Sequence, residues 1–91
     1  MSSFIYDNAI FALDMLSHGD DPGYAMIVSG VSALEALQEE PSSLEPAQLA
    51  LVEAARCLLD LANESELPLA ADSRIRAAQF AYGLRQCAER R

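Results

Sequence analysis

The stretch AMIVSGVSALEAL, residues 25–37, decides the fold, because it fits either one helix or a buried strand that ends in a turn at Ser29-Gly30. Its apolar residues do not alternate with polar ones, as they would in a half-buried strand. At 3.6 residues per turn one apolar face continues across Ser29-Gly30, and it is formed by Met26, Ile27, Ala33, Leu34 and Leu37. A fully buried strand stays open as the alternative, but this continuity favours a helix.

Gly30 lies in the middle of that apolar face. Glycine costs about 1 kcal/mol relative to alanine inside a helix, so its position needs a packing reason. The nearby residues Ala25, Ser29, Ala33 and Ala36 are also small. We therefore expect a helix-packing notch at Gly30, filled by an aromatic side chain from the first or the last helix. Gly30→Leu should then cost more stability than Ser29→Ala.

Three segments rich in proline and polar residues interrupt the chain, and such segments are typical of connections between elements. They are HGDDPG (18–23), EEPSSLEP (39–46) and NESELP (63–68). The remaining segments have helical length and predict an all-α fold, a compact bundle of four helices. The expected helices are 4–17, 22–39, 44–63 and 72–90.

Two helix starts carry specific signals. Asp21-Pro22 places an N-cap aspartate before a proline at the first helical position, which predicts the start of the second helix. For the third helix, Ser42 and Glu45 have capping-box spacing, and Glu45-Pro46 is an alternative start.

The first and last helices each show two apolar faces, whereas a surface helix usually needs only one. In the first helix the main face holds Ile5, Ala9, Ala12, Leu13 and Leu16, and the second stripe holds Phe4, Phe11 and Met15. In the last helix the main face holds Ala77, Phe80, Ala81, Leu84, Cys87 and Ala88, and the second stripe holds Ile75, Ala78 and Tyr82, flanked by Arg74 and Arg85.

The third helix is the best candidate for the centre of the core. Its expected apolar face is wide and consists of Ala50, Leu51, Ala54, Ala55, Leu58, Leu61 and Ala62, with Cys57 at its edge.

The chain has 91 residues, which we interpret as a single domain over 1–91. Hydrophobic residues make up 52% of it, a large share for a domain with so little interior. One explanation is a tight bundle rich in alanine and leucine. The other, which we favour, is a bundle completed by a second copy, as a homodimer, or by another protein.

The charge is unevenly distributed. The net charge is −8, and all six basic residues are arginines. Residues 1–72 hold 13 acidic groups and Arg56, a balance of −12, whereas residues 73–91 hold five arginines and Glu89, a balance of +4. Direct binding to nucleic acid or to an anionic membrane is not expected, because it relies on many cations.

The sequence favours a cytoplasmic protein. It has no apolar run of about 18 residues that could span a membrane, and MSSFIYDN lacks the basic start of a signal peptide. Cys57 and Cys87 form no CxxC motif, so we expect two buried thiols rather than a disulfide. Abundant arginine without lysine suggests a GC-rich bacterial genome.

No catalytic, metal or cofactor motif is recognisable, so we expect no enzyme, no bound metal and no cofactor. Ser17 and His18 stand beside Asp20 and Asp21, which suggests a nucleophile with its base or a metal site. However, adjacent residues in a tight turn do not easily converge on one atom. His18 at a helix C-terminus is instead explained by capping and the helix dipole.

The informative features are therefore surfaces. Aromatic residues, methionine and arginine are enriched at protein interfaces, and the expected partner or dimer interface consists of Phe4, Phe11, Met15, Arg74, Ile75, Tyr82 and Arg85. The sequence does not separate the dimer surface from the partner surface.

Three functions fit these surfaces. We favour a small regulatory protein that binds a transcription regulator or an enzyme and inhibits or sequesters it. A secretion chaperone or assembly adaptor is the second. An acidic mimic of nucleic acid is the third, and its carboxylates would be Asp7, Asp14, Glu35, Glu39, Glu53 and Asp60.

Overall fold

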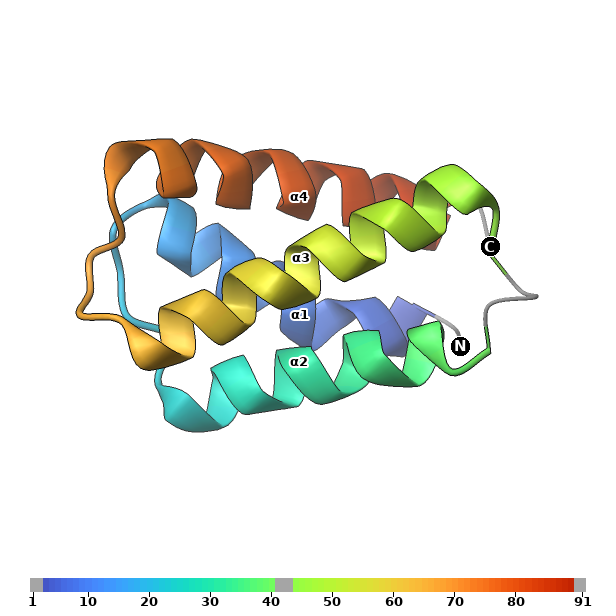
Figure 1. Ribbon diagram of the computed structural model, residues 1–91, viewed down its shortest axis with the longest axis horizontal. Helices are drawn as coiled ribbons and strands as arrows, with labels where there is room; N and C mark the ends of the chain where they lie inside the picture. The colour runs from blue at the N-terminus through green and yellow to red at the C-terminus, as the bar shows by residue number, and fades with distance from the viewer. Residues whose placement is uncertain (1–2, 41–43, 90–91) are drawn as a thin grey trace.

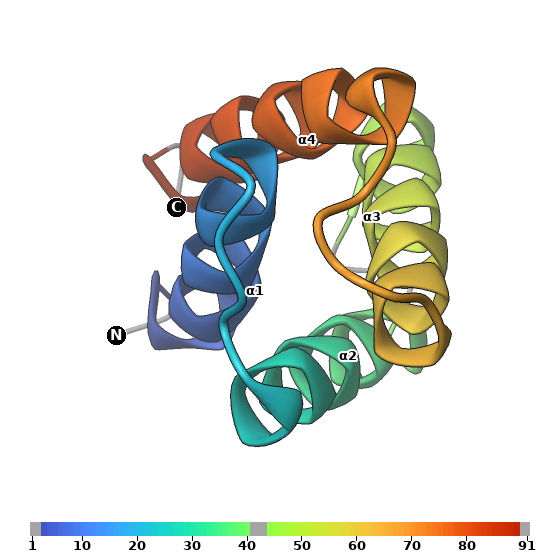
Figure 2. The same cartoon turned by 90° about the vertical axis from the view of Figure 1, so that its left-hand side faces the viewer.

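The computed structural model confirms an all-α bundle and describes the backbone of residues 3–40 and 44–89, with side chains from residue 6 onward. Its helices are α1 (Ser3–Ser17), α2 (Tyr24–Gln38), α3 (Pro46–Glu64) and α4 (Ala71–Glu89). Consecutive helices run in opposite directions along a body of 35 × 22 × 19 Å (Figure 1). Seen from one end, they form the four sides of a square, with α1 opposite α3 (Figure 2).

Helix α1 packs extensively on both α2 and α4 and little on α3. Its expected main face is confirmed where the side chains are described, since Ala9, Ala12, Leu13 and Leu16 are buried; Ile5 lies outside these. The buried face also includes Tyr6 and Ile10, which the sequence analysis did not assign to it. A helix that packs against two neighbours needs a buried arc wide enough for both, which explains these two additions.

Helix α1 ends in a turn that satisfies its last carbonyl groups. The backbone N–H of Asp20 donates to the carbonyl of Met15 at 2.9 Å, and that of Gly19 donates to Leu16 at 3.1 Å. Gly19 has a φ of +81°, the left-handed conformation that glycine adopts without strain. This pair of bonds is the Schellman motif, and His18 occupies the C-cap position within it.

Helix α2 is one continuous helix, as predicted, but its start is two residues later than expected. Gly23 has a φ of +92°, which no α-helix accommodates. The carboxylate Oδ1 of Asp21 accepts a hydrogen bond from the Gly23 N–H at 2.8 Å, so it closes a turn instead of capping the helix. Tyr24 is therefore the first helical residue.

Helix α3 uses the alternative start at Glu45-Pro46. The Glu45 N–H donates to Oε1 of Gln48 at 2.9 Å, with Pro46 in the first helical position. The predicted apolar face was partly wrong, because Ala50 and Leu61 are exposed while Val52 and Leu59 are fully buried. Apolar residues surround much of this helix, so periodicity alone could not select the buried arc.

Two glycines allow close approaches between helices. A Cβ at Gly30 would lie 3.2 Å from the Cα of Ala9 in α1 and 3.0 Å from Cδ1 of Leu59 in α3. The notch at Gly30 therefore exists, but backbone and a leucine fill it, and the expected aromatic residue was wrong. At Gly83 in α4, a Cβ would lie 2.8 Å from Cδ2 of Leu51 in α3.

Helix α4 begins at Ala71, one residue earlier than expected. Its main face is confirmed, with Ala77, Ala81, Leu84 and Cys87 buried and Phe80 and Ala88 packed at the edge of the core. Helix α3 packs mostly on α2 and less extensively on α4. The two helices lie close together near Gly83 and diverge toward the loop that connects them (Figure 1).

Candidate functional site

The outer sides of α1 and α4 carry most of the predicted interface residues. Phe11 is 52% exposed, Ile75 59% and Tyr82 64%. The Tyr82 hydroxyl accepts a hydrogen bond from Nε2 of Gln86 at 2.8 Å, which leaves its ring on the surface. Met15 is half-buried. Phe4 lies in α1, but its side chain is outside the described ones. Whether this surface meets a partner or a second copy stays a prediction.

An ion pair connects the two helices across this surface. Nη2 of Arg85 lies 3.7 Å from Oδ2 of Asp14, and both side chains are nearly half exposed, at 49% and 44%. Exposed pairs of this kind stabilise a fold by less than about 1 kcal/mol. Arg85 can therefore exchange this carboxylate for another at little cost.

Arg74 packs against the end of α1 rather than pointing freely into solvent. Its Nη1 would lie 3.4 Å from a Cβ at Gly19, which follows the C-terminal end of α1. Because the C-terminal end of a helix carries partial negative charge, a guanidinium is favourable there. Its Nε is buried and has no hydrogen-bond partner within the described part of the chain. The side chain also helps to line a shallow groove of about 290 Å³, together with Ser17, Ala71, Ile75 and Ala78.

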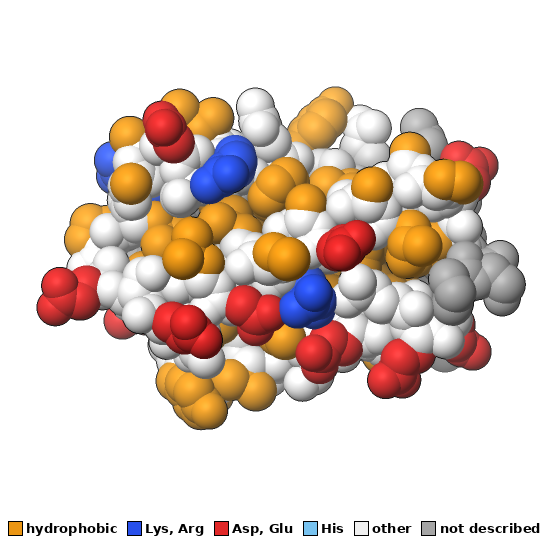
Figure 3. All heavy atoms as spheres, viewed as in Figure 1, with side chains coloured by type: hydrophobic (Ala, Val, Ile, Leu, Met, Phe, Trp, Pro, Cys, Tyr) orange, Lys and Arg blue, Asp and Glu red, His pale blue; other side chains and the backbone are white. Residues whose placement is uncertain are grey.

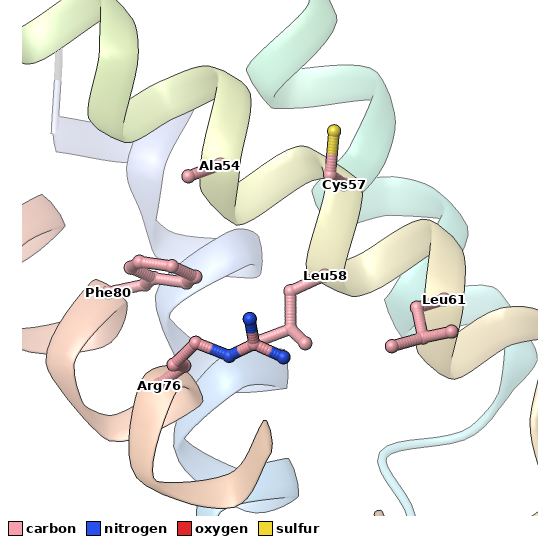
Figure 4. A pocket seen from close by; sticks show the side chains of 6 residues that line it. All are labelled: Ala54, Cys57, Leu58, Leu61, Arg76 and Phe80. Carbon is pink, nitrogen blue, oxygen red and sulfur yellow. The ribbon is translucent and has the colours of Figure 1, made fainter. Parts of the chain in front are cut away.

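A second groove lies where α3 and α4 diverge (Figure 4). It has a volume of about 270 Å³ and is mostly apolar. Its lining consists of Ala54, Cys57, Leu58 and Leu61 from α3 and Arg76 and Phe80 from α4. Leu58 forms a buried floor, whereas Leu61 is 46% exposed. We name this site the α3–α4 groove.

Arg76 is the single charged residue among those that line the α3–α4 groove. Its side chain extends from α4 toward Leu58 (Figure 4). Its Nη2 donates to the hydroxyl of Ser73 at 3.3 Å, and it makes no ion pair with a carboxylate of the described residues. By contrast, Arg56 binds Oδ2 of Asp60 at 2.7 Å. A cation beside an apolar surface without its own counter-ion marks a place where an external carboxylate would be stabilised.

The α3–α4 groove was not predicted from the sequence, because Leu61 was expected in the core and Arg76 was not among the candidate residues. One signal could have indicated it. Arg76 stands four residues before Phe80 and seven before Gly83, so all three share one side of α4. This side combines a cation, an aromatic ring and a residue without a side chain.

The two cysteines are both free, but only one is buried as expected. Cys87 is 6% exposed, and Cys57 lies on the surface at the edge of the α3–α4 groove. Cys57 is exposed because the buried arc of α3 centres on Val52 and Leu59. The expectation of two buried thiols was therefore wrong for Cys57.

The structure confirms the capping interpretation of His18. Its Nδ1 lies 2.7 Å from the carbonyl oxygen of Asp14, so this nitrogen carries the proton and donates it. The Ser17 hydroxyl donates to the same carbonyl at 2.6 Å. Both side chains thus satisfy one carbonyl of the last helical turn. Over residues 3–40 and 44–89, no group of three histidine, cysteine or acidic side chains is placed to hold a metal ion.

No known family model, curated protein or solved structure matches this chain. In the parts of the chain that the structure describes, no helix is long and apolar enough to cross a membrane. Helix α4 carries two candidate binding surfaces, the outer side shared with α1 and the groove shared with α3.

Proposed function

We propose that this chain is a non-catalytic regulatory protein of the bacterial cytoplasm, which binds another protein and inhibits or sequesters it. A transcription regulator or an enzyme is the expected target. The observation that carries this proposal is the α3–α4 groove, where exposed apolar surface surrounds a guanidinium that has no carboxylate partner among the described residues.

The shape of the groove indicates what occupies it. Ala54, Leu58 and Leu61 follow one another over two turns of α3, a length of about 10 Å. The groove is open rather than enclosed, unlike the pockets that surround small ligands. It suits two or three apolar side chains from successive turns of an amphipathic helix.

The charges around the groove orient that helix. A carboxylate among its apolar residues would pair with Arg76. Acidic side chains gather over α2 and on the α2 side of α3, below the groove in Figure 3. The acidic residues on the outer surface of α3 include Glu53, Asp60 and Glu64. The partner should therefore carry basic residues along this flank, since complementary charges fix register and speed association.

Paired variants test the groove. Leu61→Glu and Arg76→Glu change exposed side chains, so both should fold normally and reduce partner binding at least tenfold. Tyr24→Ser is the matched control, because Tyr24 is 72% exposed on α2, away from the groove. The partner is first captured from the native host and then purified for titration by calorimetry.

A charge exchange makes this test specific. Replacing the facing carboxylate of the partner with arginine should restore binding to Arg76→Glu and weaken binding to the unmodified chain. If neither groove variant changes the affinity, the partner does not bind there. If Ile75→Ser with Tyr82→Ser removes partner binding instead, the partner binds the outer surface of α1 and α4.

Salt dependence separates this proposal from nucleic-acid mimicry. Binding by a mimic should fall steeply between low and moderate salt, whereas apolar docking should persist. The carboxylates expected to form the mimic are not all free, because Asp14 lies near Arg85 and Asp60 binds Arg56. A secretion chaperone or adaptor would also use the groove, and the identity of the captured partner distinguishes it from an inhibitor.

A further inference from the structure

An unpaired apolar row runs along the outer side of α4. Its members are Ala71, Ile75, Ala78 and Tyr82, all of them exposed. They are separated by four, three and four residues, the spacing at which side chains stay in line along a helix that packs against another helix. The row spans about 16 Å of α4. We name it the α4 seam.

The bundle itself does not use this seam. Helix α4 buries a different row, which includes Ala77, Ala81 and Leu84, against the rest of the molecule. The two large residues of the seam remain more than half exposed, at 59% for Ile75 and 64% for Tyr82. Exposed apolar residues aligned at heptad spacing are what a helix presents to a second helix.

The sizes of the seam residues alternate in a way that fits a second α4. In heptad terms, Ile75 and Tyr82 occupy one core position of α4, and Ala71 and Ala78 occupy the other. In an antiparallel pair of helices, a residue at the first position lies opposite a residue at the second position of the other helix. Centred between Ile75 and Ala78, such a pair places Tyr82 of one copy against Ala71 of the other, and Ile75 against Ala78. Each large side chain then meets a small one, which fills the space between the helices. A parallel pair would stack large on large and small on small.

The charges favour contact through α4. The net charge of −8 opposes association in general. Helix α4 is the exception, since its residues 71–89 hold three arginines, Asp72 and Glu89. Contact through α4 thus joins the least acidic surfaces of two copies.

We propose that the α4 seam is the interface of a homodimer, in which two α4 helices pack antiparallel about a two-fold axis between Ile75 and Ala78. The contact is isologous, because the same row serves both copies. The seam faces away from the α3–α4 groove, so this pairing does not depend on the proposed partner site.

Analytical ultracentrifugation tests the dimer. The chain should sediment with twice its mass of 9.8 kDa. Ile75→Glu with Tyr82→Glu should give the monomer mass with an unchanged far-ultraviolet circular dichroism spectrum, because both side chains are exposed. Leu61→Glu in the α3–α4 groove should remain dimeric. A monomer mass for the unmodified chain up to its solubility limit would overturn the proposal, as would a dimer that Leu61→Glu dissociates.

Disulfide trapping tests the orientation. In a Cys57→Ser background, Ala71→Cys with Tyr82→Cys should form a covalent dimer on mild oxidation, because antiparallel pairing places these positions opposite each other. Within one chain they are about 16 Å apart, too far for a disulfide. Ala71→Cys alone should stay monomeric on a denaturing gel. A covalent dimer from Ala71→Cys alone would show parallel pairing and overturn the antiparallel assignment.

Discussion

Replacing Gly30 with alanine adds one methyl group at the point where α2 meets α1 and α3. The new Cβ would lie 3.2 Å from the Cα of Ala9 and 3.0 Å from Cδ1 of Leu59. Leu59 can turn slightly, but the Ala9 atom belongs to the backbone of α1. Relief at this contact therefore requires α1 to move relative to α2, although α1 is also packed on α4.

The expected magnitude follows from two opposing effects. Alanine improves helix propensity by about 1 kcal/mol, whereas overpacking a tight core costs about 1–3 kcal/mol. Gly30→Ala should therefore lower the free energy of unfolding by about 1 kcal/mol, which corresponds to a fall in Tm of roughly 4–8 °C for a domain of this size. Gly30→Leu should cost more, whereas Ser29→Ala, at an exposed position, should change stability by less than about 0.5 kcal/mol.

Gly83→Ala is the matched comparison. Its Cβ would meet Cδ2 of Leu51 at 2.8 Å, a shorter distance than either contact at Gly30. That atom is the free end of a half-buried side chain, which can rotate away. Gly83→Ala should therefore keep most of the propensity gain and raise the free energy of unfolding by about 0.5 kcal/mol.

Urea denaturation followed by circular dichroism measures both variants. All chains are compared at one concentration, because dimerisation would make stability depend on concentration. If Gly30→Ala raises the free energy of unfolding as much as Gly83→Ala does, then the contact with the backbone of Ala9 does not determine the effect of the substitution, and the reasoning is refuted.

Three further substitutions or treatments test individual features. Gly19→Ala should lower the free energy of unfolding by about 1 kcal/mol, because the positive φ of Gly19 at the end of α1 disfavours a residue with a side chain. An unchanged Tm would contradict that backbone conformation. Tyr6→Phe should leave the free energy of unfolding unchanged or raise it by up to about 1 kcal/mol, since the buried hydroxyl has no hydrogen-bond partner among the described residues. A clear decrease in the free energy of unfolding, measured by urea denaturation, would contradict this. Ellman's reagent should react with Cys57 in the folded chain and with Cys87 only after denaturant is added, and equal rates would contradict the difference in burial.

The helices could be predicted from the sequence because polar segments separate them and each has a recognisable apolar face. The start of α2 could not, because Asp21-Pro22 is equally suited to an N-cap and to a turn. The positive φ of Gly23 decided between them, and this backbone conformation depends on the path of the chain from α1 to α2. At α3, both possible starts were recognised, and the structure selected Glu45-Pro46.

Packing was harder to predict than secondary structure. Gly30 was recognised as a notch, but its occupant depends on how α1 crosses α2, which periodicity does not encode. In α3, alanine and leucine surround most of the helix, so Leu61 could not be distinguished from Leu59. The α3–α4 groove could not be predicted either, because it exists only where these two helices diverge.

The contact between α1 and α4 has a consequence for how the chain folds. These helices are separated in sequence by residues 18–70, yet they pack extensively on each other. When distant segments come into contact, the entropy of the intervening loop is lost before the contact contributes stability, and this slows folding. Pairing of α1 with α2, and of α2 with α3, can form early from neighbouring segments. The face of α1 that packs on α4 would then stay accessible to solvent until α4 docks, so the slow step should be the docking of α4.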